Sequence, residues 1–148
     1  MDSFLADSPF GRSIFDSDIL EAVEFLDDWE ERYGYFIDLG KSLPALPETL
    51  KTESNLVRGC QSQVWLTHTL GDDGKLWFGV DSDALIVRGL AALVLAALNG
   101  KSPQQLLAYD MTGYFERLNL LKHLSPTRGN GVQAMVQRIL ATASDNAH

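Results

Sequence analysis

Residues 63–80 read QVWLTHTLGDDGKLWFGV, two extended runs on either side of a turn. In residues 63–70 apolar and polar side chains alternate, which is the period of a strand with one buried face. Residues 71–74, GDDG, are turn formers, and residues 76–80 are typical of a returning strand. The stretch therefore predicts an antiparallel hairpin. Because an isolated hairpin is only marginally stable in water, helices must cover one of its faces.

The segment after the hairpin supplies the most apolar helix of the chain. Ser82-Asp83 is a capping sequence, and the predicted helix runs to about Asn99, before Gly100. Its side chains are apolar nearly all round, and a helix of that kind usually lies at the centre of a domain. We therefore predict that this helix is the buried core element.

Apolar residues at three-and-four spacing predict an amphipathic helix between Ile19 and Gly40. Ser17 or Asp18 is expected to cap it, and Gly34 is a point at which it can divide in two. Further helices are predicted to begin at Ser102-Pro103, at Thr112 and at Ser125-Pro126. The fold class is therefore α+β: a small antiparallel sheet built on the hairpin and packed among about five helices.

Size and charge limit the function classes. The 148 residues are enough for one domain with its own core, and the formal net charge of -8 makes general nucleic-acid binding unfavourable. Residues 1–50 hold 12 acidic and 3 basic side chains, which predicts a solvated face or a surface for a basic partner. The start of the chain has no signal-peptide pattern, and the longest apolar run, 89–98, is too short for a membrane span. We expect a cytoplasmic protein that does not bind membranes.

Cys60 is the single cysteine, so an internal disulfide is excluded. Two interpretations stay open for it: a small buried apolar side chain, or a reactive thiol. Its neighbours Arg58 and Gly59 favour the second, since a guanidinium, or a helix N-terminus folded nearby, would lower the thiol pKa and glycine leaves room for a sulfur donor.

The other chemistry-bearing residues give weaker signals. The available metal ligands are Cys60, His68, His123 and His148, without any paired metal-binding spacing, so neither a metal site nor a resident cofactor is expected. A Cys–His hydrolase or transferase using His68 or His123 stays open as an alternative. Residues 129–134, GNGVQA, match a dinucleotide-binding pattern, but no strand precedes them, and they are interpreted as the start of a helix.

Several motifs together resemble the SufE family of sulfur acceptors. They are WEERY at 29–33, LGKSLP at 39–44, VRGCQSQVW at 57–65, DSDALIVRGL at 81–90 and LSPTR at 124–128. The resemblance extends over about residues 17–140 and suggests one SufE-like domain, 1–148, with residues 1–16 as an N-terminal extension. Residues 8–11, SPFG, resemble the CsdE branch of the family, whereas 61–63, QSQ, resemble the SufE branch.

The resemblance implies a function in sulfur transfer. A pyridoxal-phosphate cysteine desulfurase of the SufS or CsdA type would hold sulfur as a persulfide, and Cys60 would accept it and pass it toward iron–sulfur cluster assembly. The chain would stimulate the desulfurase without being an enzyme itself, and the cofactor would belong to the partner. Gln61, Ser62 and Arg128 are the implied partner-binding residues, and the implied fold is similar to that of iron–sulfur scaffold proteins. A non-catalytic adaptor that uses the acidic helix is a third possibility.

Overall fold

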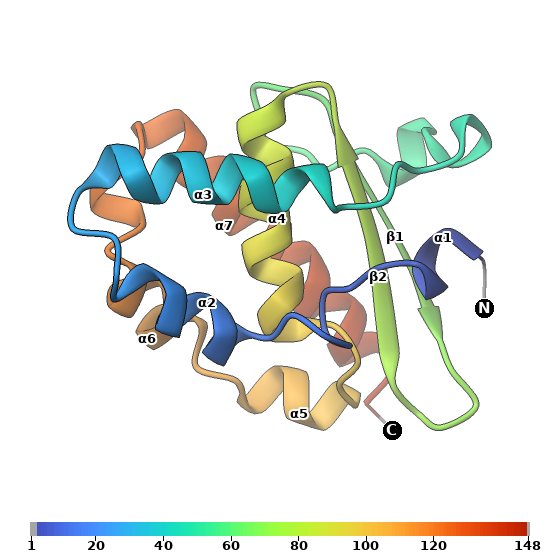
Figure 1. Ribbon diagram of the computed structural model, residues 1–148. Coiled ribbons are helices and arrows are strands. Elements are labelled where there is room, and N and C mark those ends of the chain that lie inside the picture. The colour runs from blue at the N-terminus through green and yellow to red at the C-terminus, as the bar shows by residue number, and fades with distance from the viewer. Residues whose placement is uncertain (1–2, 148) are drawn as a thin grey trace.

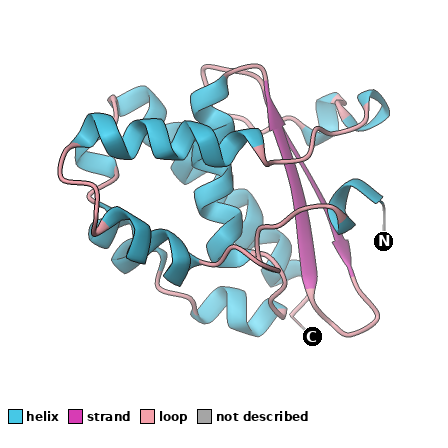
Figure 2. Ribbon diagram, viewed as in Figure 1, coloured by secondary structure: helices cyan, strands magenta, loops and turns pink. Residues whose placement is uncertain are grey.

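The computed structural model describes residues 3–147, which form helices around one antiparallel hairpin (Figures 1 and 2). The strands are β1 (Val64–Leu70) and β2 (Leu76–Ser82). The α-helices are α1 (Ser3–Ala6), α2 (Asp16–Val23), α3 (Trp29–Lys41), α4 (Leu85–Leu98), α5 (Pro103–Ala108), α6 (Met111–Leu118) and α7 (Pro126–Asp145). Three short 3₁₀ helices lie in the connections: η1 (Glu48–Leu50), η2 (Glu53–Asn55) and η3 (Leu121–His123). The predicted α+β class is confirmed.

The hairpin has the predicted antiparallel pairing. Val64 pairs with Ser82 at one end and Leu70 with Leu76 at the other, so the register closes on the predicted GDDG turn. In the turn the N–H of Gly71 donates to the carbonyl of Lys75 over 2.8 Å. Strand β2 continues two residues beyond the prediction, because Asp81 and Ser82 still pair with the start of β1.

Helix α4 lies at the centre of the molecule, as predicted from its composition. It runs beside β2 and crosses behind α3 in Figure 1. Residues 89–98 of α4 are all buried. The crossing with α3 is very close: a Cβ added to Gly40 would lie 2.6 Å from the backbone nitrogen of Gly89. Two glycines therefore bring the helix backbones into direct contact.

The first amphipathic segment does form two helices, but it does not divide at Gly34. The break falls at residues 24–28, between α2 and α3, and Gly34 lies inside α3 with open space around it. The break is stabilised by Asp28, whose carboxylate accepts the N–H of Glu31 and caps α3. Arg32 also donates to the carbonyls of Val23 and Leu26, which satisfies groups freed at the break.

The predicted first residues of the helices are correct where a serine precedes a proline. The other helices begin at residues different from the predicted ones. The hydroxyls of Ser102 and Ser125 cap α5 and α7 as expected. In contrast, Ser17 and Asp18 lie inside α2, which begins after Phe15, and α6 is capped by the carboxylate of Asp110 rather than by Thr112. Helix α4 begins after Ala84, whose N–H donates to the Ser82 hydroxyl. At α6, the carboxylate of Asp110 therefore takes the capping position that was expected for Thr112.

The segment before α2 packs against the rest of the domain. Helix α1 lies next to β2 (Figure 1), and Phe10 is fully buried. The buried side-chain amide of Asn99 donates to the carbonyl of Phe10 over 3.2 Å and accepts the N–H of Phe78 over 2.7 Å. Asn99 thus joins the N-terminal segment to the middle of β2. The boundary of an N-terminal extension at residue 16 stays a prediction.

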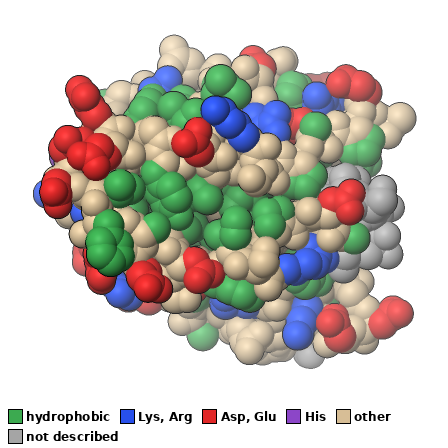
Figure 3. All heavy atoms as spheres, in the orientation of Figure 1, with side chains coloured by type: hydrophobic (Ala, Val, Ile, Leu, Met, Phe, Trp, Pro, Cys, Tyr) green, Lys and Arg blue, Asp and Glu red, His purple; other side chains and the backbone are tan. Residues whose placement is uncertain are grey.

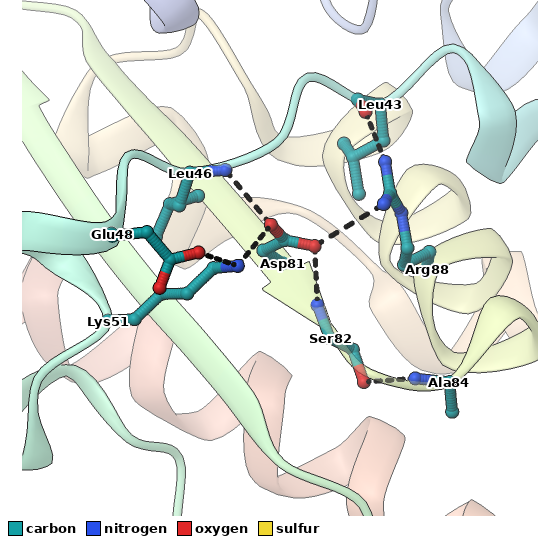
Figure 4. A network of polar contacts seen from close by, with 8 residues as sticks. All are labelled: Leu43, Leu46, Glu48, Lys51, Asp81, Ser82, Ala84 and Arg88. Atoms are coloured by element: carbon teal, nitrogen blue, oxygen red, sulfur yellow. Dashed lines mark hydrogen bonds and ion pairs between the residues drawn. The ribbon is translucent and has the colours of Figure 1, made fainter.

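A buried carboxylate fixes the connection between α3 and η1 to the hairpin and to α4 (Figure 4). Asp81 on β2 accepts the N–H of Leu46 over 3.0 Å and forms ion pairs with Lys51 at 3.6 Å and Arg88 at 3.5 Å. Arg88 in turn donates to the carbonyl of Leu43 over 2.7 Å. The Asp81 carboxylate therefore organises three elements around one buried charge.

Candidate functional site

Cys60 lies at the tip of a short loop that precedes β1. The loop is closed at its base, where the N–H of Val57 donates to the carbonyl of Val64 over 2.8 Å. Gly59 has a φ of +89°, in the left-handed region that side chains disfavour. The glycine before the cysteine is therefore needed for the turn that directs the thiol toward α7.

A second connection holds the far side of the loop. The N–H of Gln63 donates to the Asp83 carboxylate over 3.2 Å, and the N–H of Asp83 donates to the Gln63 carbonyl over 3.4 Å. This reciprocal pair joins the loop to the segment just before α4. The position of Cys60 is thus set by contacts at both ends of its loop.

The Cys60 side chain is half-buried and lines a small pocket of about 60 Å³ between its loop, α4 and the start of α7. The apolar lining comes from Val64, Val87, Leu90, Val132 and Met135, and the polar lining from Gln61, Ser62, Thr127 and Arg128. Among the predicted site residues, Gln61, Ser62 and Arg128 therefore lie around the same pocket as the thiol. A half-buried sulfur in a pocket with a polar side is still open to an incoming reagent.

The environment of the thiol favours its protonated form. Burial raises the pKa of Cys60, and its sulfur is 3.6 Å from the carbonyl oxygen of Gly131, to which the S–H donates. The expectation that Arg58 lowers this pKa is wrong. Arg58 is exposed, pairs with Glu53 at 3.3 Å and does not line the pocket. Although α7 begins nearby, Cys60 meets a carbonyl of that helix rather than its free N–H groups.

Arg128 approaches the pocket from the first turn of α7. Its N–H donates to the capping hydroxyl of Ser125 over 3.3 Å, and its guanidinium Nη1 donates to the hydroxyl of Tyr33 over 3.1 Å. Tyr33 belongs to α3, 95 residues away in the chain. The sequence placed Tyr33 only in the WEERY motif and gave no sign that it contacts Arg128.

His68 and His123 lie away from the pocket lining. His68 is on β1, with its ring 6.2 Å from that of Phe78, and burial lowers its pKa. His123 is in η3 and stacks on Trp29 at 4.6 Å. Neither lines the Cys60 pocket, and His148 lies outside the described residues. A Cys–His hydrolase therefore finds no support in the placement of His68 and His123.

Residues 129–134 lie inside α7, so they are helical as expected, although the helix itself begins earlier, at Pro126. Their connection to the site is the Gly131 carbonyl, which accepts the Cys60 thiol, and this role could not be inferred from the glycine pattern. Within residues 3–147, no three His, Cys, Asp or Glu side chains gather into a group that could hold a metal ion. A site without metal stays a prediction.

A family model described as "SufE: Fe-S metabolism associated domain" matches residues 17–143. The chain belongs to the SufE family. The match includes the Cys60 loop, both strands and helices α3 to α6, together with most of α7. The family resemblance stated from the motifs is therefore confirmed.

Individual relatives agree with the family match. An uncharacterized SufE-like protein of Rhizobium meliloti (strain 1021) is 48% identical over 128 residues, which cover 84% of this chain and 91% of that protein. The sulfur acceptor protein CsdE of Escherichia coli (strain K12) is 38% identical over 136 residues, 92% of each chain. Both similarities extend over more than four fifths of this chain.

The fold is also found in a solved structure. The solution structure of a hypothetical protein from Thermus thermophilus superposes with a TM-score of 0.69, covering 87% of this chain and 95% of that one, at 22% sequence identity. At that identity the comparison supports the fold alone. Among residues 3–147, no helix has both the length and the apolar character that a bilayer-spanning segment needs.

Proposed function

We propose that this protein is a sulfur acceptor whose Cys60 receives sulfane sulfur from the persulfide of a cysteine desulfurase. The observation that carries the proposal is the single thiol of the chain, half-buried at a pocket that also contains Arg128, in a member of the SufE family. A relative with 38% identity is named a sulfur acceptor protein. The partner is a pyridoxal-phosphate enzyme of the SufS or CsdA type.

The chemical step is a thiol–persulfide exchange. The Cys60 thiolate attacks the terminal sulfur of the donor persulfide, a new S–S bond forms on Cys60, and the S–S bond in the donor breaks. The donor cysteine leaves as a thiolate and takes up the proton that Cys60 loses. No external oxidant or reductant is needed, because one persulfide is exchanged for another.

The protonated resting thiol fits a carrier that reacts only with its partner. Because the thiolate is the nucleophile, a raised pKa keeps Cys60 slow toward stray electrophiles at neutral pH. Docking of the desulfurase would remove water from the pocket mouth and place the persulfide beside the thiol. Gln61, Ser62 and Arg128 then provide polar contacts to the partner around the reacting sulfur atoms.

Discharge follows the same chemistry in the opposite direction. A thiolate of the next acceptor attacks the terminal sulfur on Cys60, which restores the Cys60 thiolate and loads the acceptor. Removing sulfur from the desulfurase frees it for another turnover, so the carrier accelerates that enzyme without catalysing a reaction alone. The sulfur passes to iron–sulfur cluster assembly in the cytoplasm.

Intact-mass measurement after incubation with a desulfurase and cysteine tests the proposal. The wild-type chain should gain the mass of one or more sulfur atoms, and Cys60→Ser should gain none. A double variant, Cys60→Ser with Ser62→Cys, moves the only thiol two residues along the same loop and serves as a matched control. Sulfur on Cys60→Ser, or equal loading of the double variant and the wild type, would contradict a specific role for position 60.

Each desulfurase should be tried separately, and release of alanine from cysteine should be followed in parallel. Wild-type protein should accelerate alanine release by the proper partner, whereas Cys60→Ser should not. Substitution of His68 by alanine should leave this acceleration unchanged, because His68 does not line the pocket. Turnover of a thioester or ester without any desulfurase would instead favour the hydrolase alternative.

A further inference from the structure

Among the described residues, the guanidinium of Arg128 is held by one side chain, that of Tyr33. Its backbone is fixed by the Ser125 cap at the start of α7, but an exposed arginine side chain on a helix has many rotamers. The hydrogen bond from Nη1 to the Tyr33 hydroxyl selects one of them. Among residues 3–147, no carboxylate forms an ion pair with Arg128. Tyr33 is therefore the group that places this positive charge.

Tyr33 itself stands on a rigid platform of rings. Its ring packs edge-on against Trp29 at 6.2 Å, and Trp29 packs edge-on against Phe36, which is fully buried in the core. On its other side Trp29 stacks on His123 at 4.6 Å with an interplanar angle of 13°. These contacts restrict the rotamers of Trp29 and Tyr33. The hydroxyl that binds Arg128 is thus presented in a fixed position.

The contact leaves most of the guanidinium available. A guanidinium carries five N–H donors, and Tyr33 uses one of them through Nη1. The Tyr33 hydroxyl is neutral, so it positions the cation without cancelling its charge, which a carboxylate at the same place would do. Arg128 therefore keeps an uncompensated positive charge beside the pocket that contains Cys60.

We propose that Tyr33 is a positioning residue for sulfur transfer, which holds the Arg128 guanidinium at the mouth of the Cys60 pocket so that its charge favours the anionic sulfur of the exchange. The inference rests on the proposed function and extends it to a residue on a different helix. Both the attacking thiolate and the departing donor thiolate are anions, and a fixed cation near both lowers the energy of the reaction path. A mobile arginine would supply the same charge for only part of the time.

A competing interpretation is that the Tyr33–Arg128 bond merely joins α3 to α7. The two interpretations predict different reactivities of Cys60 toward charged and neutral reagents. A purely structural bond would change the stability of the protein without changing how Cys60 discriminates between charged and neutral reagents. A positioning bond would change that discrimination, and only while Arg128 is present.

Alkylation of Cys60 measures this charge without any partner. The ratio of its rates with anionic iodoacetate and neutral iodoacetamide reports the local positive potential, since access and thiol pKa affect both reagents alike. A unit charge about 6 Å away in water changes such a ratio about threefold. Arg128→Ala should lower the ratio about threefold, and Tyr33→Phe should lower it part of the way. In the double variant the ratio should be no lower than in Arg128→Ala.

Tyr35→Phe is the matched control, because Tyr35 lies on the same helix as Tyr33. Within the described residues, the Tyr35 hydroxyl has no hydrogen-bond partner. Its ratio should equal that of the wild type, and thermal unfolding should show that every variant is folded. The inference is overturned if Tyr33→Phe leaves the ratio unchanged, changes both alkylation rates equally, or has the same effect in the Arg128→Ala background.

Sulfur loading by a desulfurase separates this inference from the proposed function. Tyr33→Phe should slow the loading of Cys60, Arg128→Ala should slow it more, and the two changes together should add nothing to the second. If the wild type loads sulfur and Tyr33→Phe loads it equally fast, the positioning inference fails while the sulfur acceptor function stands. If the wild type takes no sulfur although the alkylation ratios behave as expected, the proposed function fails while the charge placement by Tyr33 stands.

Discussion

At the crossing of α3 and α4, Gly40 and Gly89 bring two helix backbones into direct contact. At Gly131 of α7, in contrast, the neighbouring Cys60 is far enough away to leave room for a side-chain carbon. A Cβ on Gly89 would lie 2.4 Å from the carbonyl oxygen of Phe36, which no real side chain allows. A Cβ on Gly131 would lie 3.5 Å from the Cys60 sulfur, a normal van der Waals separation. The same residue type thus serves a rigid frame in one region and an accommodating site in the other.

This difference indicates how the molecule divides its tasks. The frame of α3, α4 and the hairpin is closed by buried apolar side chains and by the Asp81 network, so it has little freedom. The thiol is placed where this frame meets the start of α7, at a pocket with a polar side. Changes in the frame should therefore cost stability, and changes beside the thiol should alter reactivity with little effect on folding.

The largest loss of stability is expected for Asp81→Ala. Removal of this buried carboxylate leaves Lys51 and Arg88 without their shared partner and frees the N–H of Leu46. Breaking a buried ion pair from one side costs about 3–5 kcal/mol. The free energy of unfolding in urea measures this loss. Asp72→Ala, at the exposed hairpin turn, is the control and should change stability by less than about 0.5 kcal/mol; equal losses would contradict the importance of the buried network.

Gly40→Ala should have the next largest effect. Its methyl group would collide with the backbone of Gly89, so α3 and α4 must separate, at a cost of about 2–3 kcal/mol. Gly34→Ala makes the same substitution in the same helix where space is open, and should gain about 0.5–1 kcal/mol. Thermal and urea unfolding of both variants measure the difference, and tolerance of Gly40→Ala would mean that the crossing is not rigid.

The pH dependence of Cys60 alkylation tests the other region. Burial raises the thiol pKa, so at neutral pH the folded protein holds less thiolate than the unfolded chain. The rate with iodoacetamide should therefore rise with pH to a midpoint above that of the same protein in urea. A midpoint at or below the unfolded value would contradict the raised thiol pKa and mean that positive charge near Cys60 outweighs its burial.

The raised pKa of Cys60 also affects stability. Because the folded state favours the protonated thiol, the contribution of Cys60 to the free energy of unfolding declines as the pH rises above the unfolded pKa.

The smallest effect is expected for Gly129→Ala, in the first turns of α7. A Cβ there would lie 4.0 Å from the nearest atom, a Leu121 methyl carbon, so the helix gains propensity without a clash. Stability should rise by about 0.5–1 kcal/mol, and the rate of sulfur loading on Cys60 should stay unchanged. A strong change in the rate of loading would show that the start of α7 must deform during transfer. Helix geometry would then matter for reactivity at Cys60 as it matters for stability at the crossing of α3 and α4.

Local patterns predicted much of the frame. The alternation in residues 63–80 and the continuous apolar character of residues 89–98 each report burial directly, because a strand and a central helix expose their pattern in the sequence. The break between α2 and α3 was misplaced because it depends on Arg32, which binds carbonyls freed by the break and also the carbonyl of Leu118. A contact between residues so far apart leaves no periodic signal.

The site was predictable only in part. Cys60 stood out as the single thiol, and the motifs added Arg128, which lines the same pocket. Arg58 was favoured because it is close in sequence, but it pairs with Glu53 instead. The contribution of Tyr33 depends on a hydrogen bond between α3 and the start of α7, from residues 95 positions apart, and only the three-dimensional structure reveals it.

Acidic side chains gather over α2 and the start of α3, at the left of Figure 3, and include Glu21, Glu24, Asp27, Asp28, Glu30 and Glu31. Phe25, between these two helices, is 79% exposed among them. The acidic surface predicted from the first 50 residues is therefore exposed in the described fold, and a basic partner for it stays a prediction. Charge reversal at Glu30 and Glu31 would test the adaptor possibility separately from the chemistry at Cys60.

The bond between Asn99 and Phe10 has a practical meaning for anyone who shortens this chain. Trimming to the family-matched start at residue 17 would remove the Phe10 ring from its place in the core and leave the Asn99 amide without its acceptor. Expression of such a fragment should give a less stable, aggregation-prone product. An affinity tag is better fused ahead of the first residue, with the whole leading segment retained.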